Sequence, residues 1–249
     1  MKSGGTSINF AFLRGLCDPS VEVPAVCETP LGTVHGDAVR PWELYISLTR
    51  NPSYELTVQG RRVVGHRPCR APDERFYYWF SHQPTPRSAL PADAYAFTCL
   101  RNPLTRLLSY FSEIRAFCEL GTLSLWGMER YQDVPVGEWI GRTPPQELCH
   151  QVYLFSETGN VDEAIDRISR LDRIVFTEAL DDGFAILSRD TGIPLPRYRI
   201  RSNNPRIPAT LLGEERLLEA VEKEFQLLEA LGRRIEIPRA TLDRRAVVA

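Results

Sequence analysis

The feature of the sequence that most constrains the fold is an apolar segment that runs directly into an amphipathic helix. Residues 94–100, AYAFTCL, are apolar throughout, which is typical of a strand covered on both faces. The segment ends at Arg101-Asn102-Pro103, where Asn102 is a good N-cap and Pro103 a good first helical residue. Apolar residues at helical spacing follow at Leu104, Leu107, Leu108, Phe111 and Ile114. Strand, elbow and helix in this order form half of a βαβ unit.

The rest of the chain alternates short apolar segments with helical ones. Helices are predicted over 8–16, 146–155, 161–171, 182–192 and 210–231, and strands over 61–66 and 172–180. Residues 119–145 are expected to form a loop-rich insertion, 240–249 a loose tail, and 42–49 either a helix or a strand. The fold class predicted is α/β: one three-layer domain over residues 1–249 with a central, mostly parallel sheet.

Composition excludes several classes of function. A formal net charge of −2 argues against nucleic-acid binding through bulk charge. No apolar run approaches the roughly 18 residues that a membrane span requires. The chain start has too short an apolar stretch for a secretory signal, so a cytoplasmic protein is expected.

The cysteines do not form a metal or disulfide pattern. Six are scattered through the chain without any Cys-x-x-Cys pair, and none is spaced with a histidine as in a zinc site. Buried free thiols and no bound metal are therefore expected.

A glycine-rich segment near the chain start has the composition of a phosphate cradle. Gly4 and Gly5 let the main chain approach an anion closely, and the N-terminus of the following helix would attract it. The side chains that add donors are Lys2, Ser3, Thr6 and Ser7. The chain contains no Gly-Lys dipeptide, so this is not a Walker A loop. The alternative is an unstructured start.

Arg101 and Ser109 form a second candidate phosphate site. Arg101 stands at the carboxyl end of the predicted strand, the edge where open α/β sheets bind ligands. Thr105, Ser109 and Ser112 share one polar side of the following helix. A guanidinium and a hydroxyl suit a terminal phosphate. The alternative is an arginine that caps a strand end and a serine that faces solvent.

His66 is the candidate general base. It closes the short strand predicted within RRVVGHRP, and Pro68 prevents the strand from continuing. A histidine at such an end can titrate near neutral pH and accept a proton. The alternative is a structural histidine.

Together these three features resemble the sulfotransferases that use 3′-phosphoadenosine 5′-phosphosulfate (PAPS). KSGGTS resembles their 5′-phosphosulfate loop, and VVGHRP the strand-end segment that carries their catalytic base. Arg101, Pro103, Arg106 and Ser109 match their 3′-phosphate motif, R-x-P-x-x-R-x-x-S. The later segments CHQVYLF, RIVFTEALDD and RSNNPRIP are similar in order to the carbohydrate-type branch, so the resemblance spans essentially the whole chain.

The resemblance implies a P-loop-like α/β fold and transfer of a sulfuryl group from PAPS to an acceptor hydroxyl on a saccharide or small molecule. His66 would be the base, and Lys2 would stabilise the departing phosphate. Arg101 and Ser109 would hold the 3′-phosphate. The 5′-phosphate would be held by Lys2, Ser3, Gly4, Gly5, Thr6 and Ser7. The family pattern requires no metal.

The start of the chain departs from the family pattern. The family's loop follows a buried strand, yet here Met1 takes the place of everything before Lys2; either the true start lies upstream or the fold lacks its first strand. Two other functions are also open. One is a P-loop nucleotide kinase, which the missing Walker lysine disfavours, and the other is a non-catalytic, sulfotransferase-like nucleotide-binding or interaction module.

Overall fold

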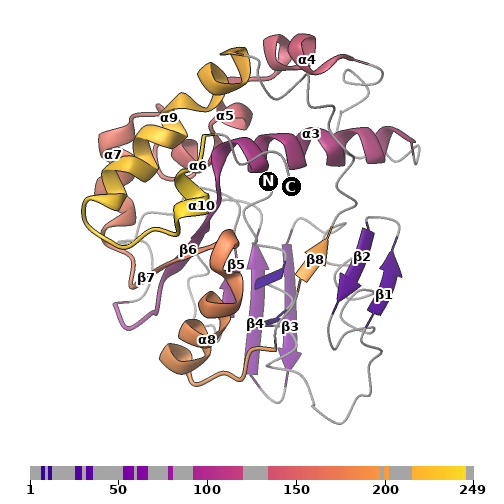
Figure 1. Cartoon of the computed structure of the whole chain (residues 1–249). Coiled ribbons are helices and arrows are strands. Elements are labelled where there is room, and N and C mark those ends of the chain that lie inside the picture. The colour runs from indigo at the N-terminus through magenta and orange to yellow at the C-terminus, as the bar shows by residue number, and fades with distance from the viewer. Residues whose placement is uncertain are drawn as a thin grey trace.

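The structure is a computed structural model whose longest described parts are residues 92–119, 134–196 and 215–244 (Figure 1). Shorter described segments are 7–8, 11–12, 26–29, 32–35, 53–58, 61–66, 78–80 and 199–201. The segment 42–49, for which the sequence favours neither helix nor strand, lies outside the described residues.

A parallel strand pair and the helices between its strands form the unit that carries the candidate site. β6 (Phe97–Leu100) and β7 (Arg173–Phe176) pair in parallel, with Leu100 beside Phe176 at their carboxyl ends. α3 (Pro103–Glu119) begins directly after Asn102. Parallel strands require a crossover connection, and helices supply it here. The predicted order of strand, elbow and helix is therefore confirmed, as is a strand within 172–180.

The remaining strands form two further groups. The first is antiparallel throughout and consists of β1 (Val26–Thr29), β2 (Gly32–His35) and β8 (Arg199–Arg201). In the second, β4 (Arg61–His66) pairs antiparallel with β3 (Ser53–Val58) and parallel with β5 (Tyr78–Phe80). The described residues thus combine helices with both kinds of strand pairing, in three separate groups of strands.

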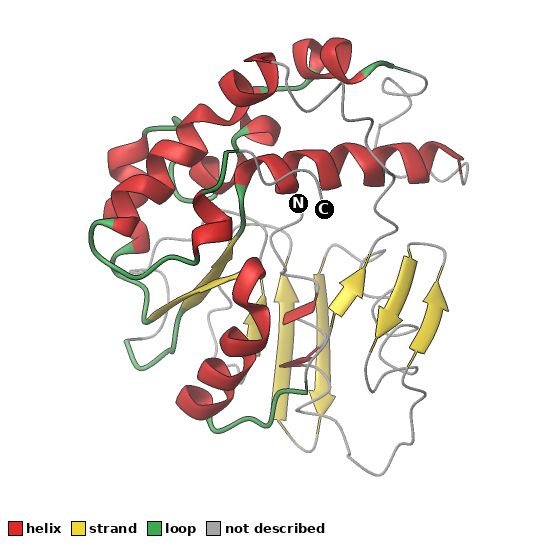
Figure 2. Ribbon diagram, viewed as in Figure 1, coloured by secondary structure: helices red, strands yellow, loops and turns green. Residues whose placement is uncertain are grey.

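Helices make up most of the described chain (Figure 2). Besides α3 they are α4 (Val136–Arg142), α5 (Pro145–Leu148), α6 (His150–Tyr153), α7 (Val161–Ile168), α8 (Leu180–Thr191), α9 (Glu215–Gly232) and α10 (Arg239–Leu242). The predicted helix over 182–192 ends as expected, because Gly192 adopts the left-handed conformation (φ 69°) that terminates helices. Among the described residues, no helix has the length and apolar character needed to cross a membrane.

α9 holds the helical part together. It packs against α3, α4, α5, α6, α7 and α10. Leu217, Val221 and Phe225 join a core cluster with α3 and with Trp139 of α4. Leu227, Leu228 and Leu231 join a second cluster that includes Leu100, Phe176 and the buried face of α7. Fully burying a side chain of this size contributes about 1.5–3 kcal/mol, so α9 fixes α3 relative to the strand pair.

The loop-rich insertion predicted over 119–145 is wrong for its last part, where α4 forms. Trp139 is fully buried and its ring lies 5.0 Å from that of Phe111 and 5.9 Å from that of Tyr110. The glycines that indicated a loop lie on either side of this tryptophan, at 137 and 141. Burial of a large aromatic side chain outweighs their weak helix propensity.

The single helix predicted over 146–155 is two short helices. α5 and α6 are separated at Cys149, whose backbone (φ −107°, ψ 43°) leaves the helical region. The break rotates the segment so that Leu148, Gln151 and Val152 are all buried.

The loose tail predicted over 240–249 is wrong for residues 240–244. α10 forms there, and Thr241 is fully buried. Arg244 lies 4.5 Å from the ring centroid of Phe225 and forms ion pairs with Glu222 and Glu229 on α9. A polar sequence without apolar periodicity gave no sign of these contacts; residues 245–249 lie outside the described part.

Candidate functional site: the elbow after β6

The elbow between β6 and α3 is built around a fully buried asparagine. The Oδ1 atom of Asn102 accepts the Thr105 N–H at 3.1 Å, so the predicted N-cap is confirmed. Its Nδ2 atom donates to the carbonyls of Ala240, Thr241 and Asp243, at 3.2, 3.2 and 2.7 Å. One side chain therefore starts α3 and holds the C-terminal segment against the elbow.

Glu178 joins the same two segments. It lies in the turn directly after β7, and its Oε1 accepts the Asn102 N–H at 2.9 Å. Its Oε2 accepts the Thr241 hydroxyl, also at 2.9 Å. The carboxylate thus completes a hydrogen-bonded frame around residue 102.

Gln151, on α6, binds the main chain of Arg101 on both sides. Its Oε1 accepts the Arg101 N–H at 2.7 Å, and its Nε2 donates to the Arg101 carbonyl at 3.0 Å. Gln151 is buried, with 2% of its surface exposed. Both peptide groups of Arg101 are therefore paired although the residue lies beyond the paired part of β6.

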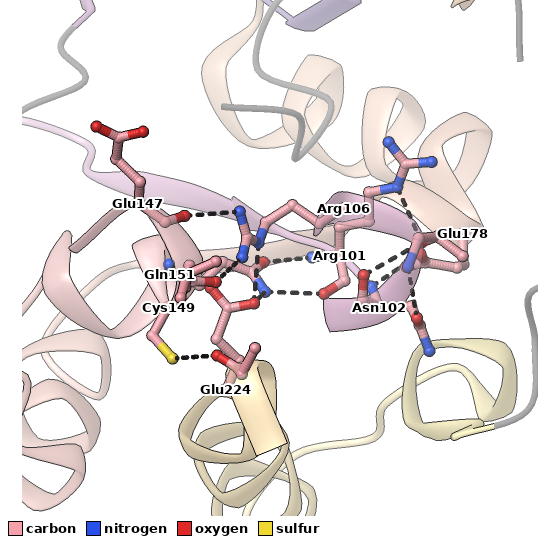
Figure 3. Close-up of polar contacts among 11 residues, drawn as sticks. Arg101, Asn102, Arg106, Glu147, Cys149, Gln151, Glu178 and Glu224 are labelled. Carbon is pink, nitrogen blue, oxygen red and sulfur yellow. Dashed lines mark hydrogen bonds and ion pairs between the residues drawn. The ribbon is translucent and has the colours of Figure 1, made fainter. Parts of the chain in front are cut away.

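Arg106 is part of the framework. Its Nε donates to Oε2 of Glu224 on α9 at 2.9 Å, and both side chains are almost completely buried. The guanidinium also donates to the carbonyls of Glu147 and Leu148. Figure 3 shows Arg106, Gln151 and Glu224 meeting in one cluster, in which Glu224 also accepts the N–H and the Nε2 of Gln151 at 2.7 and 3.1 Å. Of the two arginines in the motif, Arg106 is committed to an internal ion pair.

The side chain of Arg101 lies along the first turn of α3. Its Nε donates to the Thr105 hydroxyl at 3.1 Å, and that hydroxyl donates in turn to the Asn102 carbonyl. Burial lowers the pKa of Arg101 from its ordinary value, and the Glu178 carboxylate acts in the opposite direction. An arginine guanidinium stays charged at neutral pH, because its ordinary pKa lies far above neutrality. The site therefore presents a half-buried positive charge with the Glu178 carboxylate nearby.

Ser109 is buried, with 6% of its surface exposed, so the interpretation as a solvent-facing serine is wrong. It lies one turn beyond Thr105 on the same face of α3, because the two residues are four apart. No hydrogen bond to the Ser109 hydroxyl is formed by any side chain in the described part of the chain. Ser112, by contrast, donates to the Leu108 carbonyl at 2.8 Å.

His66 is the last residue of β4, as predicted, and lies opposite Ser53 of β3. Its imidazole is outside the described side chains.

The predicted phosphate loop is described only at its end. Lys2, Ser3, Gly4, Gly5 and Thr6 lie outside the described residues. Ser7 is helical and buried, as is Ile8, and Ala11 and Phe12 are helical as well, which agrees with the helix predicted from residue 8. The Phe12 ring stacks on that of Phe97 at 5.4 Å, so the helix after the loop packs against β6.

Cys99 and Cys149, the cysteines whose side chains the structure describes, are free thiols, as predicted. Burial raises the pKa of Cys99 to about 12 and that of Cys149 to about 11. Neither is a thiolate nucleophile at neutral pH. Within the described ranges, no three His, Cys, Asp or Glu side chains gather in a way that would hold a metal ion.

Gln151 and Glu178 stand in segments that carry the family resemblance, but no role in the site was predicted for them or for Glu224. The sequence does carry a signal for Glu224, since it falls seven residues after Leu217 and directly before Phe225, on the apolar face of its helix. A carboxylate on a buried face requires a charged partner, but the sequence does not say which one.

Comparison of the chain with protein-family models, curated proteins and solved structures found no significant match.

Proposed function

We propose that the protein is a PAPS-dependent sulfotransferase, in which Arg101 and Ser109 hold the 3′-phosphate of the nucleotide. The observation that carries the proposal is the arrangement of Arg101, Thr105 and Ser109. Arg101 directly follows the carboxyl end of a parallel strand, and its Nε donates to the Thr105 hydroxyl. The buried Ser109 hydroxyl lies one turn beyond Thr105 on α3. The Arg101 guanidinium and the Ser109 hydroxyl, a cation and a hydrogen-bond donor, suit a phosphate that carries two negative charges.

The proposal assigns the chemistry to two residues and the binding of the 5′-phosphate to the loop that follows Lys2. The acceptor oxygen attacks sulfur in line, and the bond between sulfur and the bridging oxygen of the 5′-phosphate breaks. His66 takes the acceptor's proton, a role that contributes about 10²–10⁴-fold to such reactions. Lys2 stabilises the charge that develops on the departing phosphate oxygen, and the loop from Ser3 to Ser7 binds the 5′-phosphate. Positioning and charge stabilisation dominate, as in phosphoryl transfer.

We also propose how the parallel strand pairs are arranged in the fold. The parallel pair β6–β7 and the parallel pair β4–β5 would belong to one central sheet of a three-layer, P-loop-like domain. Packing of Phe12 on Phe97 supports it, because it brings the helix that follows the phosphate loop against β6. The carboxyl ends of parallel strands then meet at one edge, where Arg101 and His66 both stand.

The first experiment measures equilibrium binding of adenosine 3′,5′-bisphosphate by calorimetry. Arg101→Ala is expected to weaken binding about 10- to 100-fold, because it removes a charged hydrogen-bonding partner of phosphate. Arg142→Ala is the matched control, since Arg142 is half-exposed and pairs with Glu138 within α4. If the wild-type protein does not bind the nucleotide, or if Arg101→Ala binds it as tightly, the proposal is wrong.

A second experiment separates transfer from binding alone. Sulfur-labelled PAPS is incubated with the protein and a panel of saccharides and small-molecule alcohols, and label in the acceptor is counted. Transfer is the expected result. Tight nucleotide binding without transfer to any acceptor favours a binding module instead, and Mg²⁺-dependent ATP binding favours a nucleotide kinase.

A further inference from the structure

We infer that Gln151 is the positioning residue of the site: its amide fixes the main chain of Arg101 and thereby the direction in which the guanidinium meets the 3′-phosphate. The inference rests on the proposed function.

The amide of Gln151 binds the main chain of Arg101, just beyond the end of β6. The β6–β7 register ends at Leu100 and Phe176, so Arg101 is the first residue beyond it. Gln151 gives the main chain of Arg101 both an acceptor, at 2.7 Å, and a donor, at 3.0 Å. An amide side chain therefore takes the place of a neighbouring strand for one residue, and that residue carries the proposed anion-binding group.

Gln151 is itself held firmly. Glu224 accepts its N–H at 2.7 Å and its Nε2 at 3.1 Å, and Glu224 is paired with Arg106. Arg106 belongs to the first turns of α3, so the contacts start at Arg101, just before this helix, and end on the helix itself (Figure 3). Because all three side chains are at most 2% exposed, water does not compete for these bonds.

The arrangement acts on the direction of the side chain. The bond from Cα to Cβ of Arg101 is set by the two peptide groups that Gln151 binds, and Glu178 also binds the second of these groups, through the Asn102 N–H. A phosphate-binding group that is misplaced by about 1 Å can lose most of its effect. Loss of Gln151 should therefore weaken recognition of the 3′-phosphate even though Gln151 belongs to another helix.

The test compares adenosine 3′,5′-bisphosphate with adenosine 5′-phosphate in the full-length protein. The ratio of the two affinities measures what the 3′-phosphate contributes. Gln151→Met keeps the size of the side chain and removes both hydrogen bonds to Arg101, together with the one from Nε2 to Glu224. It is expected to lower this ratio about three- to tenfold while leaving binding of the monophosphate nearly unchanged. Arg101→Ala gives the value of the ratio when the guanidinium is absent.

Two further variants keep the test decisive. Thr143→Val removes another buried hydrogen bond, from the Thr143 hydroxyl to the Trp139 carbonyl at 2.7 Å, and is expected to leave the ratio unchanged. Gln151→Asn keeps the amide but is one methylene too short to span both Arg101 groups, so it should lower the ratio even if Gln151→Met does not fold.

The outcomes separate the two proposals. If the wild-type ratio is near one, the proposed function is wrong and the role of Gln151 is wrong with it. If the wild-type ratio is high and folded Gln151 variants keep it, or if they lose both ligands equally, only the positioning role is overturned.

Discussion

The two ends of the β6–β7 pair use the same kinds of contact in opposite environments. At the amino end, Asp172 accepts the Ala96 N–H at 2.7 Å, and Asp190 accepts hydrogen bonds from Tyr95 and Arg173. At the carboxyl end, Glu178 accepts the Asn102 N–H, and Glu224 pairs with Arg106. The side chain of Arg173 is 40% exposed, whereas that of Arg106 is 1% exposed.

The difference in exposure indicates which end of the strand pair depends more strongly on its ion pairs and hydrogen bonds. Exposed pairs contribute little because water competes for each partner. Buried pairs are costly to assemble, and removing one partner leaves a charge with no solvation. At the carboxyl end, both carboxylates are occupied by main-chain groups, Arg106, Gln151 and Thr241, so they build the frame around Arg101. The amino end is built from the same groups without such a frame.

The largest effect is expected from breaking the buried pair. Glu224→Leu leaves the Arg106 guanidinium buried without its counter-charge and should lower the free energy of unfolding by about 3–5 kcal/mol. Arg173→Ala, at the exposed end, should cost at most about 1 kcal/mol. Urea unfolding of both variants measures the two values.

A double variant checks the cause. Arg106→Met combined with Glu224→Leu removes both charges and should recover part of the loss, because no unpaired charge stays buried; the hydrogen bonds to Gln151 and Leu148 are not restored. If Glu224→Leu lowers the free energy of unfolding no more than Arg173→Ala does, the buried ion pair does not contribute more to stability than the exposed one.

The next effect compares two asparagine caps. Asn102→Ala should lower the free energy of unfolding by about 2–3 kcal/mol, because it removes the cap of α3 and a donor to three buried carbonyls. Asn160→Ala should cost about 1 kcal/mol, since Asn160 only caps α7, through the Glu163 N–H at 3.0 Å. Equal losses in urea unfolding would contradict the bridging role of Asn102.

Hydrogen exchange gives an independent measurement of the same bridge. In Asn102→Ala, amides of residues 239–244 should exchange faster than in the wild-type protein, because the segment has lost its attachment to the elbow. In Asn160→Ala they should exchange at the wild-type rate.

Local parts of the fold were predictable because they depend on neighbouring residues. The N-cap at Asn102, the start of α3 at Pro103 and the helix end at Gly192 all follow from side-chain chemistry within one turn. The order of β6, α3 and β7 followed from apolar periodicity for the same reason. α10 was missed because its stabilising contacts come from Asn102 and Glu178, more than sixty residues away in the chain.

The residues that we propose to bind the nucleotide were indicated by the sequence, whereas the residues that support them were not. Arg101 and Ser109 stand in a motif with fixed spacing, so the sequence indicates them directly. Gln151 and Glu224 act through contacts between helices, and a single sequence does not show which helices meet. Arg106 illustrates the limit: the motif groups it with Arg101, but its environment makes it a core residue.

The smallest effect is expected at the amino end, and it depends on pH. Hydrogen bonds from Tyr95 and then Arg173 lower the pKa of Asp190 to about 2, below its ordinary value near 4. Above pH of about 4 the carboxylate is charged in both the folded and unfolded states, and its stabilising contribution is complete. Between about pH 4 and 2 the unfolded chain takes up the proton first, so the contribution is lost as the pH falls. The difference in unfolding free energy between the wild type and Asp190→Asn should therefore shrink over this window and stay constant from pH 5 to 7. All other carboxylates are the same in the wild type and in Asp190→Asn, so their contributions cancel in the difference. If the difference does not change between pH 5 and 2, Tyr95 and Arg173 do not hold Asp190 in its charged form.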